Sequence, residues 1–290
     1  MIKVIASDLD GTLLSTNHVL NQVTAEAILK AQAAGIRFVV ATGRDYMGAT
    51  RTFEGHEIDC DWIVASGAEI RDNQGNILQS IPMRHEHFPI ILDKVKDLNV
   101  HIRFCVTGAD YVIGNEAEVM EALKEEAKLF LSLKDGENIE DHKEFKVIKQ
   151  RMRCVESLEA LLETGLPIYK VFISSPDVSQ IELANERLSG IPGIASASSF
   201  VTNVELTDER AQKGPIIKQY IEERGYQMDE VMVLGDSLND YSMISMDFGA
   251  TVAMENAMDE IKKTAKYITK SNAENGVAYV IEQLLEKQGR

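Results

Sequence analysis

The sequence predicts an α/β fold, a Rossmann-like parallel-sheet core into which a second, smaller α/β domain is inserted. Short apolar segments alternate with amphipathic segments from the first residues onward, which is typical of strand–helix–strand units in a parallel sheet. Several apolar segments end in Asp, Thr, Ser or Gly, and ligands of open α/β sheets bind beyond the carboxyl ends of the strands. Between residues 84 and 209 long charged helical stretches dominate instead. We therefore expect a core of residues 1–83 and 210–290 and an insertion of residues 84–209.

The first part of the core begins with a strand. Residues 4–6 are apolar and mostly β-branched, as expected of a buried parallel strand. An amphipathic helix is predicted from about Gln22 to Ala34, with Asn21 as its N-cap and Gly35 as the glycine that follows its last turn. Two further core strands are expected at residues 36–41 and 62–65, followed by Thr42-Gly43-Arg44 and Ser66-Gly67-Ala68.

The same two patterns describe the insertion and the return to the core. Helical periodicity with frequent charges predicts helices at residues 116–131, 157–164 and 178–189. Strand-like segments lie between and around them, at residues 101–106, 111–113, 169–174 and 201–206. A helix is then expected from Pro215 to Glu223, with the proline near its first position. Core strands return at residues 231–234 and 250–253.

Composition limits the classes of partner and the compartment. A net charge of −16 over 290 residues disfavours nucleic acid or an anionic membrane as the partner, and any phosphate site needs local cations. Cys60, Cys105 and Cys154 are odd in number and far apart, which fits neither a disulfide framework nor a zinc site and suits a reducing compartment. The chain runs from Met1 directly into the first strand, and its apolar runs stay below the ~20 residues of a membrane span. We expect a cytoplasmic protein without a signal peptide.

Carboxylates directly follow two of the core strands. Asp8 and Asp10 follow residues 4–6, and Asp236 and Asp240 follow residues 231–234. A lone Asp after a strand is usually a turn or N-cap residue, but two such groups at one sheet edge would form an all-oxygen site. Carboxylates this close repel each other unless a cation offsets their charge. Hard oxygen ligands favour Mg²⁺ over zinc or copper.

Two weaker motifs are compatible with a phosphate site. The hydroxyl of Thr42 and the backbone N–H groups that follow it could hold a phosphate oxygen, or they could simply cap a helix. Arg44 could equally be an ion-pair partner of the carboxylate cluster. Lys213 stands before a helix and supplies a cation, although an isolated lysine is usually solvated.

These four motifs, in this order and with the insertion between the second and third, resemble the haloacid dehalogenase (HAD) superfamily. The closer resemblance is to its Cof-type phosphatases, and it covers essentially the whole chain. It implies that residues 1–83 and 210–290 form a HAD-like catalytic core and that residues 84–209 form a large α/β cap domain. It also implies a phosphoric monoester hydrolase that depends on Mg²⁺ and forms an aspartyl-phosphate intermediate.

The resemblance assigns roles to residues at matching positions. Asp8 would be the nucleophile, and Asp10 would act as general acid and then as general base. The metal would be held by the Asp8 carboxylate, the Asp10 backbone carbonyl and Asp236, with Arg44 and Asp240 in supporting positions. The phosphoryl oxygens would be held by the Leu9 backbone N–H, Thr42, Gly43, Lys213 and Asn239.

The resemblance leaves the substrate open. It implies a small phosphorylated metabolite (a sugar phosphate, pyridoxal phosphate or a flavin-pathway phosphate). From the net charge we expect no nucleic-acid or membrane partner, and we expect a monomer or small homo-oligomer. A sugar phosphomutase with the same aspartyl-phosphate chemistry is the main alternative, and a non-catalytic phosphometabolite-binding regulator is another.

Two residues depart from the family pattern, and several others are expected to be structural. Ser66 stands where the family usually has Asn, and Glu255 stands where Gly is common before Asn-Ala, so both bear on recognition of the leaving group. Side chains expected only to pack or to lie at the surface are His85, His87, His101, Met243, Met246 and Met254.

Overall fold

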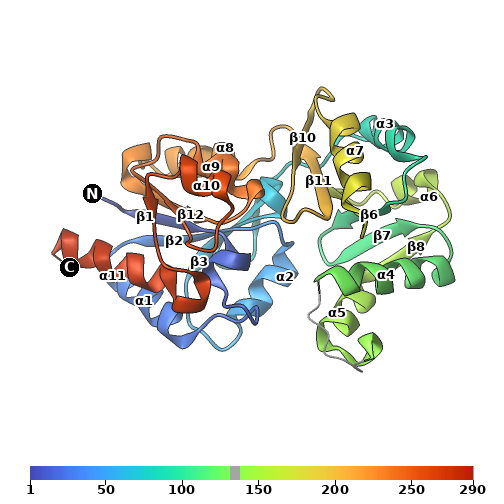
Figure 1. The fold of residues 1–290 in the computed structure, drawn as a ribbon. Coiled ribbons are helices and arrows are strands. Elements are labelled where there is room, and N and C mark those ends of the chain that lie inside the picture. The colour runs from blue at the N-terminus through green and yellow to red at the C-terminus, as the bar shows by residue number, and fades with distance from the viewer. Residues whose placement is uncertain (131–137, 290) are drawn as a thin grey trace. The chain divides into compact units, whose positions relative to one another are not determined.

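The computed structural model describes residues 1–130 and 138–289 (Figure 1). Within that part the chain forms two compact units. The first unit is made of Met1–Ile81 and Arg210–Arg290, and the second of Pro82–Glu209. The second unit is therefore inserted into the first through two chain crossings, near residues 82 and 209.

The first unit is built on a sheet with strand order β14-β13-β12-β1-β2-β3-β4-β5. From β14 to β3 all neighbours are parallel, which confirms the predicted α/β class with a Rossmann-like core. The strands are β1 (Val4–Ser7), β2 (Arg37–Ala41), β3 (Cys60–Val64), β4 (Glu69–Arg71), β5 (Ile77–Ser80), β12 (Val231–Gly235), β13 (Ala250–Ala253) and β14 (Tyr267–Ile268). Because β1 lies between β2 and β12, segments more than 200 residues apart in sequence meet at its carboxyl end.

Helices of the first unit follow the parallel strands. They are α1 (Gln22–Ala33), α2 (Tyr46–Thr50), α8 (Lys213–Glu222), α9 (Tyr241–Ile244), α10 (Asp259–Thr264) and α11 (Gly276–Gln288). Helix α1 packs against α11, the two helices being far apart in sequence. Asn21 stands at the expected N-cap position of α1 with an extended backbone, but its side chain makes no capping hydrogen bond and donates to Asn275 instead. Gly35 follows the helix with a φ of +79°, as expected.

Two details of the first unit differ from the expectation. Helix α8 begins at Lys213 rather than at Pro215, so the proline is its third residue. The short strands β4 and β5 form an antiparallel hairpin at the edge of the sheet, which the sequence analysis did not predict. Strands of three or four residues carry too few side chains to show a reliable alternation.

The second unit has a mostly antiparallel sheet of order β10-β11-β9-β6-β7-β8, in which only the pairing of β7 with β8 is parallel among the described residues. Its strands are β6 (His101–Val106), β7 (Ala109–Ile113), β8 (Met152–Val155), β9 (Lys170–Ser174), β10 (Ile194–Ala197) and β11 (Asn203–Asp208). Its helices are α3 (His87–Val95), α4 (Glu116–Phe130), α5 (Lys143–Arg151), α6 (Leu158–Glu163) and α7 (Val178–Leu188). The end expected for the first of its predicted helices, residue 131, lies outside the described residues.

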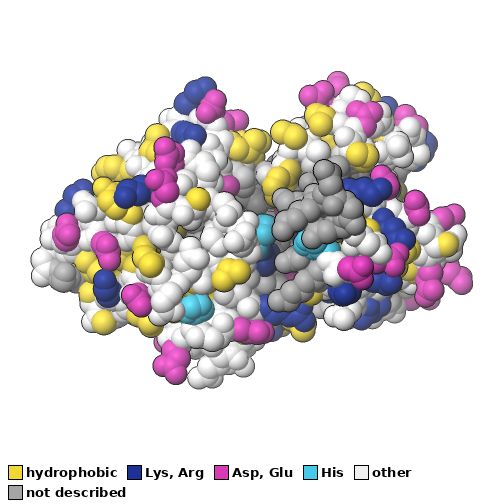
Figure 2. Space-filling model, turned by 60° about the horizontal axis from the view of Figure 1, so that its bottom comes forward, with side chains coloured by type: hydrophobic (Ala, Val, Ile, Leu, Met, Phe, Trp, Pro, Cys, Tyr) yellow, Lys and Arg dark blue, Asp and Glu magenta, His cyan; other side chains and the backbone are white. Residues whose placement is uncertain are grey.

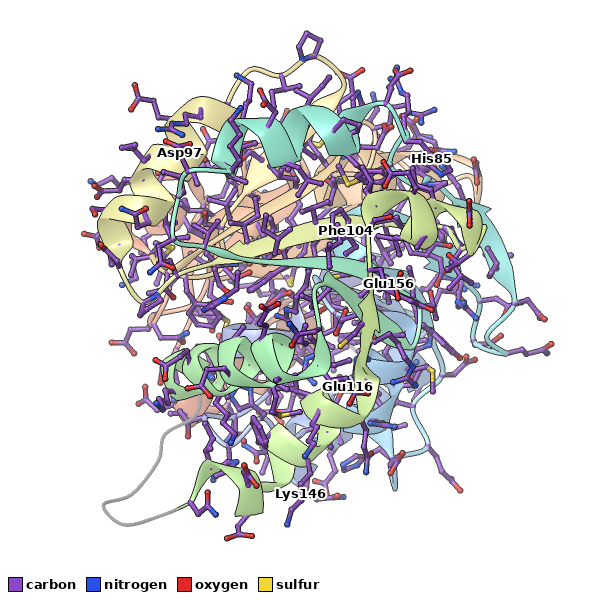
Figure 3. All side chains as sticks on the ribbon, turned by 90° about the vertical axis from the view of Figure 1, so that its right-hand side faces the viewer. His85, Asp97, Phe104, Glu116, Lys146 and Glu156 are labelled. Atoms are coloured by element: carbon purple, nitrogen blue, oxygen red, sulfur yellow. The ribbon has the colours of Figure 1, made fainter. Side chains whose placement is uncertain are left out.

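One face of this second sheet carries an apolar core under α3, α6 and α7. Phe88 of α3 meets Phe104 of β6 edge-on, with ring centroids 5.7 Å apart. Figure 3 shows Phe104 on the sheet, with α3 and α4 on opposite sides of it. A smaller apolar cluster joins α4 to α5.

The opposite side of the second sheet holds buried charges. Lys170 donates to Glu205 at 2.9 Å, and both side chains are nearly inaccessible to solvent. Burial alone would lower the pKa of Lys170, but the Glu205 charge outweighs burial and raises it. The hydrogen-bonded pair joins β9 to β11 across the sheet.

The side chains set aside as structural lie in packing or surface positions. His85 is exposed and stands near the Phe88 ring, His101 is partly buried, and His87 is buried at the start of α3. Met243 and Met254 are fully buried in the first unit, and Met246 is partly buried.

The molecular surface mixes charges of both signs. On the face drawn in Figure 2, Lys and Arg side chains are interspersed with Asp and Glu. Cys60, Cys105 and Cys154 are free thiols. Over the part of the chain that the structure describes, every helix is too short or too polar to cross a membrane.

Candidate active site

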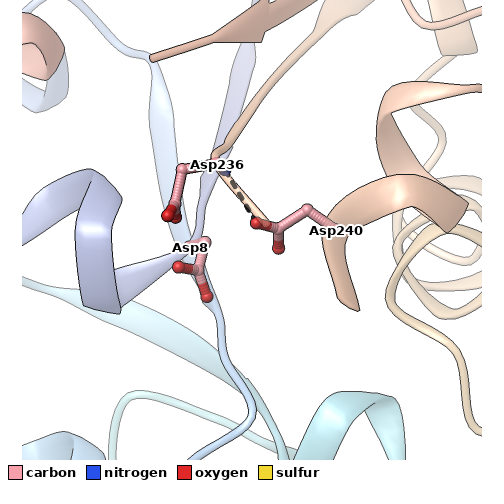
Figure 4. Close-up of side chains that lie close together, drawn as sticks. All are labelled: Asp8, Asp236 and Asp240. Atoms are coloured by element: carbon pink, nitrogen blue, oxygen red, sulfur yellow. Dashed lines mark hydrogen bonds between the residues drawn. The ribbon is translucent and has the colours of Figure 1, made fainter. Parts of the chain in front are cut away.

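The site is built at the carboxyl ends of β1 and β12, where Asp8 leaves the sheet. The Asp8 backbone N–H donates to the carbonyl of Leu234 at 3.0 Å, so the first residue after β1 is still tied to β12. The Asp8 side chain is only 5 % exposed. Figure 4 shows it beside the carboxylates of Asp236 and Asp240. Among the described residues, one carboxylate oxygen from each of the three lies within 4.8 Å of the others.

Gly11 allows Asp236 to approach the chain that follows β1. Its φ is +77°, and a Cβ at this position would lie 2.2 Å from Oδ2 of Asp236, far inside contact distance. Only glycine avoids both the backbone strain and this overlap. Thr12, the next residue, donates its hydroxyl to Oδ1 of Asp236 at 2.8 Å. The segment from Asp8 to Thr12 therefore positions the Asp236 carboxylate as well as the carboxylates that it carries itself.

Lys213 lies between two of the buried carboxylates. Its Nζ donates to Asp8 Oδ1 at 2.7 Å and to Asp240 Oδ1 at 2.6 Å, and none of its side chain is exposed. Asp240 is fixed from the other side, since its Oδ2 accepts from the backbone N–H groups of Asp236 and Ser237. The lysine is brought there by close packing of α8 on α9, because a Cβ on Gly214 would lie 2.0 Å from the Ser242 carbonyl oxygen.

The electrostatics of this cluster favour the binding of a cation. Burial, followed by the charge of Asp240, raises the pKa of Asp8 well above its usual range, and the same two causes raise the pKa of Asp236 to about 7. Burial would lower the pKa of Lys213, but Asp240 and Asp8 outweigh it and raise that pKa. Among the described groups three carboxylates therefore face one ammonium, an excess of two negative charges when all are ionised. Oxygen donors with this excess fit a hard divalent cation such as Mg²⁺.

These pKa shifts predict an unusual pH dependence for the metal-free protein. An unfolded Asp titrates near ~4, whereas Asp236 titrates at about 7 in the fold, so between these values the folded state binds more protons. The free energy of unfolding should therefore fall as the pH rises from about 4 to about 7. A salt-bridged carboxylate, whose pKa is lowered by folding, has the opposite effect. We expect the melting temperature of metal-free protein to drop by roughly 5 °C across this range, measured by differential scanning calorimetry.

Two comparisons check this prediction. The Asp236→Asn variant should show a smaller drop, because the titrating group is gone. Added Mg²⁺ should raise the melting temperature most at the upper end of the range, where the carboxylates are ionised. A wild-type profile that rises steadily up to pH 7 without metal would contradict the interpretation.

Arg44 forms an ion pair with Asp10, the arrangement that the sequence analysis considered for it. Its Nε donates to Asp10 Oδ2 at 2.7 Å and its Nη2 to Oδ1 at 2.5 Å. His18 lies on the same carboxylate, with its Nδ1 3.1 Å from Oδ1. Burial raises the pKa of Asp10, but the hydrogen bonds from His18 and Arg44 outweigh it and hold that pKa well below its usual range. In this structure Asp10 is therefore a carboxylate, ready to accept a proton.

The remaining expected residues lie in the segments that follow β1, β2 and β12. Thr42 is buried at the end of β2, and its hydroxyl accepts from the Arg44 backbone N–H at 3.1 Å. Gly43 follows it in the same loop. Asn239 belongs to a short helical turn after β12 and accepts the Ser237 hydroxyl at 2.8 Å. Leu9 is fully buried directly after Asp8. Their contacts with a phosphoryl group remain predictions.

The loop after β3 is strained where the sequence departs from the family pattern. Ala65 and Ser66 both have left-handed backbones, with φ of 50° and 61°, which is rare for residues with a side chain. The Ser66 N–H donates to the Thr42 carbonyl and the Ala65 N–H to the Arg44 carbonyl, so this loop holds the Thr42 loop in place. Gly67 packs on the backbone of Gln212, the residue before Lys213.

Sequence reasoning missed three contributors to the site. Thr12 was treated only as part of a motif. Asn256, which follows the divergent Glu255, donates to the Gly11 carbonyl at 2.8 Å. His18 lies in a loop without helical or strand periodicity. The one signal for it in the sequence is a histidine shortly after the aspartate motif. Loop geometry, which spacing does not reveal, brings it to Asp10.

The fold and the site together define a class of protein with a Rossmann-like core, aspartates at the strand ends and a buried lysine between them. The family of haloacid dehalogenase-like hydrolases matches residues 5–281, and the chain belongs to this family. A solved haloacid dehalogenase-like hydrolase from B. subtilis superimposes with a TM-score of 0.82 at 28 % identity, covering 98 % of this chain and 100 % of that one.

Curated relatives agree with the family. The 5-amino-6-(5-phospho-D-ribitylamino)uracil phosphatase YwtE of Bacillus subtilis (strain 168) is 31 % identical over 293 residues, with 99 % of each chain covered. The pyridoxal phosphate phosphatase YbhA of Escherichia coli (strain K12) is 26 % identical, covering 96 % of this chain and 97 % of its own. The prediction of an enzyme of the phosphoric monoester hydrolase class is thereby confirmed.

Proposed function

We propose that the protein is a Mg²⁺-dependent phosphatase of small phosphorylated metabolites that works through an aspartyl-phosphate on Asp8. The strongest support for this proposal is the environment of the Asp8 carboxylate. The Asp8 carboxylate is buried at the strand end, in contact with the ammonium of Lys213 and beside two further carboxylates. A nucleophilic carboxylate can approach a phosphate dianion only if positive charge offsets their repulsion.

The residues of the cluster supply that positive charge in two ways. Lys213 is itself a fixed cation, ionised because two carboxylates surround it. We propose that Asp8, the backbone carbonyl of Asp10 and Asp236 hold Mg²⁺, with Asp240 fixing Lys213 and Arg44 fixing Asp10. When bound, the metal would stabilise the charge that develops on the phosphoryl oxygens.

The proposed reaction has two steps that share Asp10. In the first, Asp10 must first take up a proton, from solvent or from the phosphate ester as it binds. An Asp8 oxygen then bonds to phosphorus, the ester P–O bond breaks, and Asp10 gives its proton to the leaving oxygen. In the second, water attacks phosphorus, its proton passes to Asp10, and Asp8 is released with inorganic phosphate. We propose that the Leu9 N–H, Thr42, Gly43, Lys213 and Asn239 hold the phosphoryl oxygens in both steps.

The proposed substrates are flavin-pathway phosphates, pyridoxal phosphate or sugar phosphates. The names of the two relatives support the first two, since one acts on a ribitylaminouracil phosphate and the other on pyridoxal phosphate. We also propose that the second unit serves as the cap domain that selects the leaving group. The free thiols support the proposal of a cytoplasmic enzyme.

A phosphate-release assay tests the proposed function. Metal-free protein is supplied with Mg²⁺ and a panel of these phosphate esters, and inorganic phosphate is measured. We expect release from at least one ester, and EDTA should lower the rate by about 10³-fold or more, with recovery on adding Mg²⁺. EDTA-insensitive turnover would contradict the metal role. Isomerisation of a hexose 1-phosphate without phosphate release would instead identify a phosphomutase.

A further inference from the structure

The carboxylate of Asp10 is held from two sides by elements far apart along the chain. Arg44, in the loop after β2, donates to both of its oxygens. His18, in the loop before α1, contacts Oδ1 through Nδ1 at 3.1 Å. The Asp10 side chain is still 38 % exposed, so packing alone does not fix its orientation. These polar contacts do.

The two partners restrict different motions of the carboxylate. The guanidinium of Arg44 donates one hydrogen bond to each oxygen of Asp10, and its Nη1 donates to the Gly48 carbonyl at 3.3 Å. Such a planar fork fixes the direction in which the carboxylate lies. The third contact comes from His18, which lies in a separate loop. It therefore keeps the side chains of Asp10 and Arg44 from moving together as one unit.

The loop that carries His18 is shaped for this contact. His18 has a φ of +56°, and its N–H donates to the Ser15 carbonyl at 2.9 Å. The Ser15 N–H and hydroxyl both bond the Val19 carbonyl at 3.0 Å, which closes the turn. Leu14 and Leu20 are buried on either side of it. A non-glycine residue in the left-handed region is uncommon and is kept where surrounding structure enforces it.

We propose that His18 is a positioning residue that orients Asp10 for proton transfer in the phosphatase reaction proposed above. Asp10 moves a proton twice, to the leaving oxygen and from the attacking water. Proton transfer needs the donor and acceptor atoms within hydrogen-bond reach, so a carboxylate that rotates freely is less effective in both steps. The inference rests on the proposed function.

An aryl phosphate separates the steps that use Asp10 from the step that does not. Nitrophenolate leaves without a proton, so kcat/KM for p-nitrophenyl phosphate reports phosphoryl transfer to Asp8 without help from Asp10. Its kcat includes hydrolysis of the aspartyl-phosphate, which needs Asp10 as base. For an alkyl phosphate, kcat/KM depends on Asp10 as acid, because an alkoxide leaves poorly unprotonated.

The test compares His18→Gly with His18→Asn in the full-length protein. Both residues tolerate the positive φ, and Asn places an amide donor where Nδ1 of the ring stands. We expect His18→Gly to lower kcat for p-nitrophenyl phosphate and kcat/KM for an alkyl phosphate by about tenfold. Its kcat/KM for p-nitrophenyl phosphate should stay within about twofold, and a burst of nitrophenolate should precede the slower steady state. His18→Asn should restore most of both losses.

Each other outcome overturns the inference. If all parameters fall together for both esters, His18 supports the fold or substrate binding rather than the proton transfers. If none changes, the contact with Asp10 has no role in turnover. If the wild-type protein hydrolyses no ester, both the proposed phosphatase function and the role of His18 are wrong. If the wild type is active and the His18 variants behave like it, only the role of His18 is wrong.

Discussion

Replacing Asp8 by Asn is expected to abolish phosphate release, lowering kcat by about 10⁴-fold or more. An amide is a poor nucleophile, and no phosphoryl-enzyme can form without the Asp8 oxygen. The fold should survive, because the substitution removes one of three mutually repelling carboxylates and leaves Lys213 paired with Asp240. Release of inorganic phosphate at saturating substrate measures the effect, and the melting temperature reports the fold.

The matched control is Asp59→Asn, an identical change at an exposed position in the same unit. It should turn over like the wild type. Phosphate release by the Asp8→Asn variant at more than about one per cent of the wild-type rate would exclude the covalent mechanism. Trapping of a phosphorylated wild-type protein, absent from the variant, would support it independently.

Replacing Lys213 by Met should impair both stability and activity. The ammonium is completely buried, and its removal leaves Asp8 and Asp240 without the cation that both contact. Breaking a buried ion pair in this way costs about 3–5 kcal/mol. Loss of the cation that we propose to hold the phosphoryl group should also reduce kcat by about 10²–10³-fold. Urea unfolding and phosphate release measure the two effects separately.

Two variants make the Lys213 result specific. Lys218→Met changes a half-exposed lysine in the same helix, which pairs only loosely with Glu222 at 3.8 Å, and should alter stability by less than about 0.5 kcal/mol. Adding Asp240→Asn to Lys213→Met removes one uncompensated charge, so it should recover part of the stability while activity stays low. A Lys213→Met protein as stable as the wild type would refute the electrostatic account.

The sequence predicted the strands of the site better than the contacts between them. The short apolar segments predict that strands end just before Asp8 and Asp236. These two residues come together only if β1 and β12 are neighbours in the sheet. The family resemblance implied this neighbourhood, whereas hydrophobic periodicity could not predict it. The sequence did not show that the Arg44 guanidinium donates to both carboxylate oxygens of Asp10.

Other features had no pattern to reveal them. His18 reaches Asp10 through a turn with a left-handed residue, and no residue type in that loop signals it. The antiparallel order of the second sheet depends on which strands are joined by hairpins, a property of long-range pairing rather than of local composition. The start of α8 was misplaced because Pro215 is also tolerated at its third position, within the first turn.

The return of the chain from the inserted unit has an evolutionary consequence. Lys213 comes only three residues after Arg210, where the first unit resumes. Gly67 packs closely against the backbone of Gln212, which lies between them. The register of the lysine is thus set within the first unit and does not depend on the length or sequence of what is inserted between residues 81 and 210. The insertion can lengthen, shrink or be exchanged for another while the reaction chemistry is inherited unchanged.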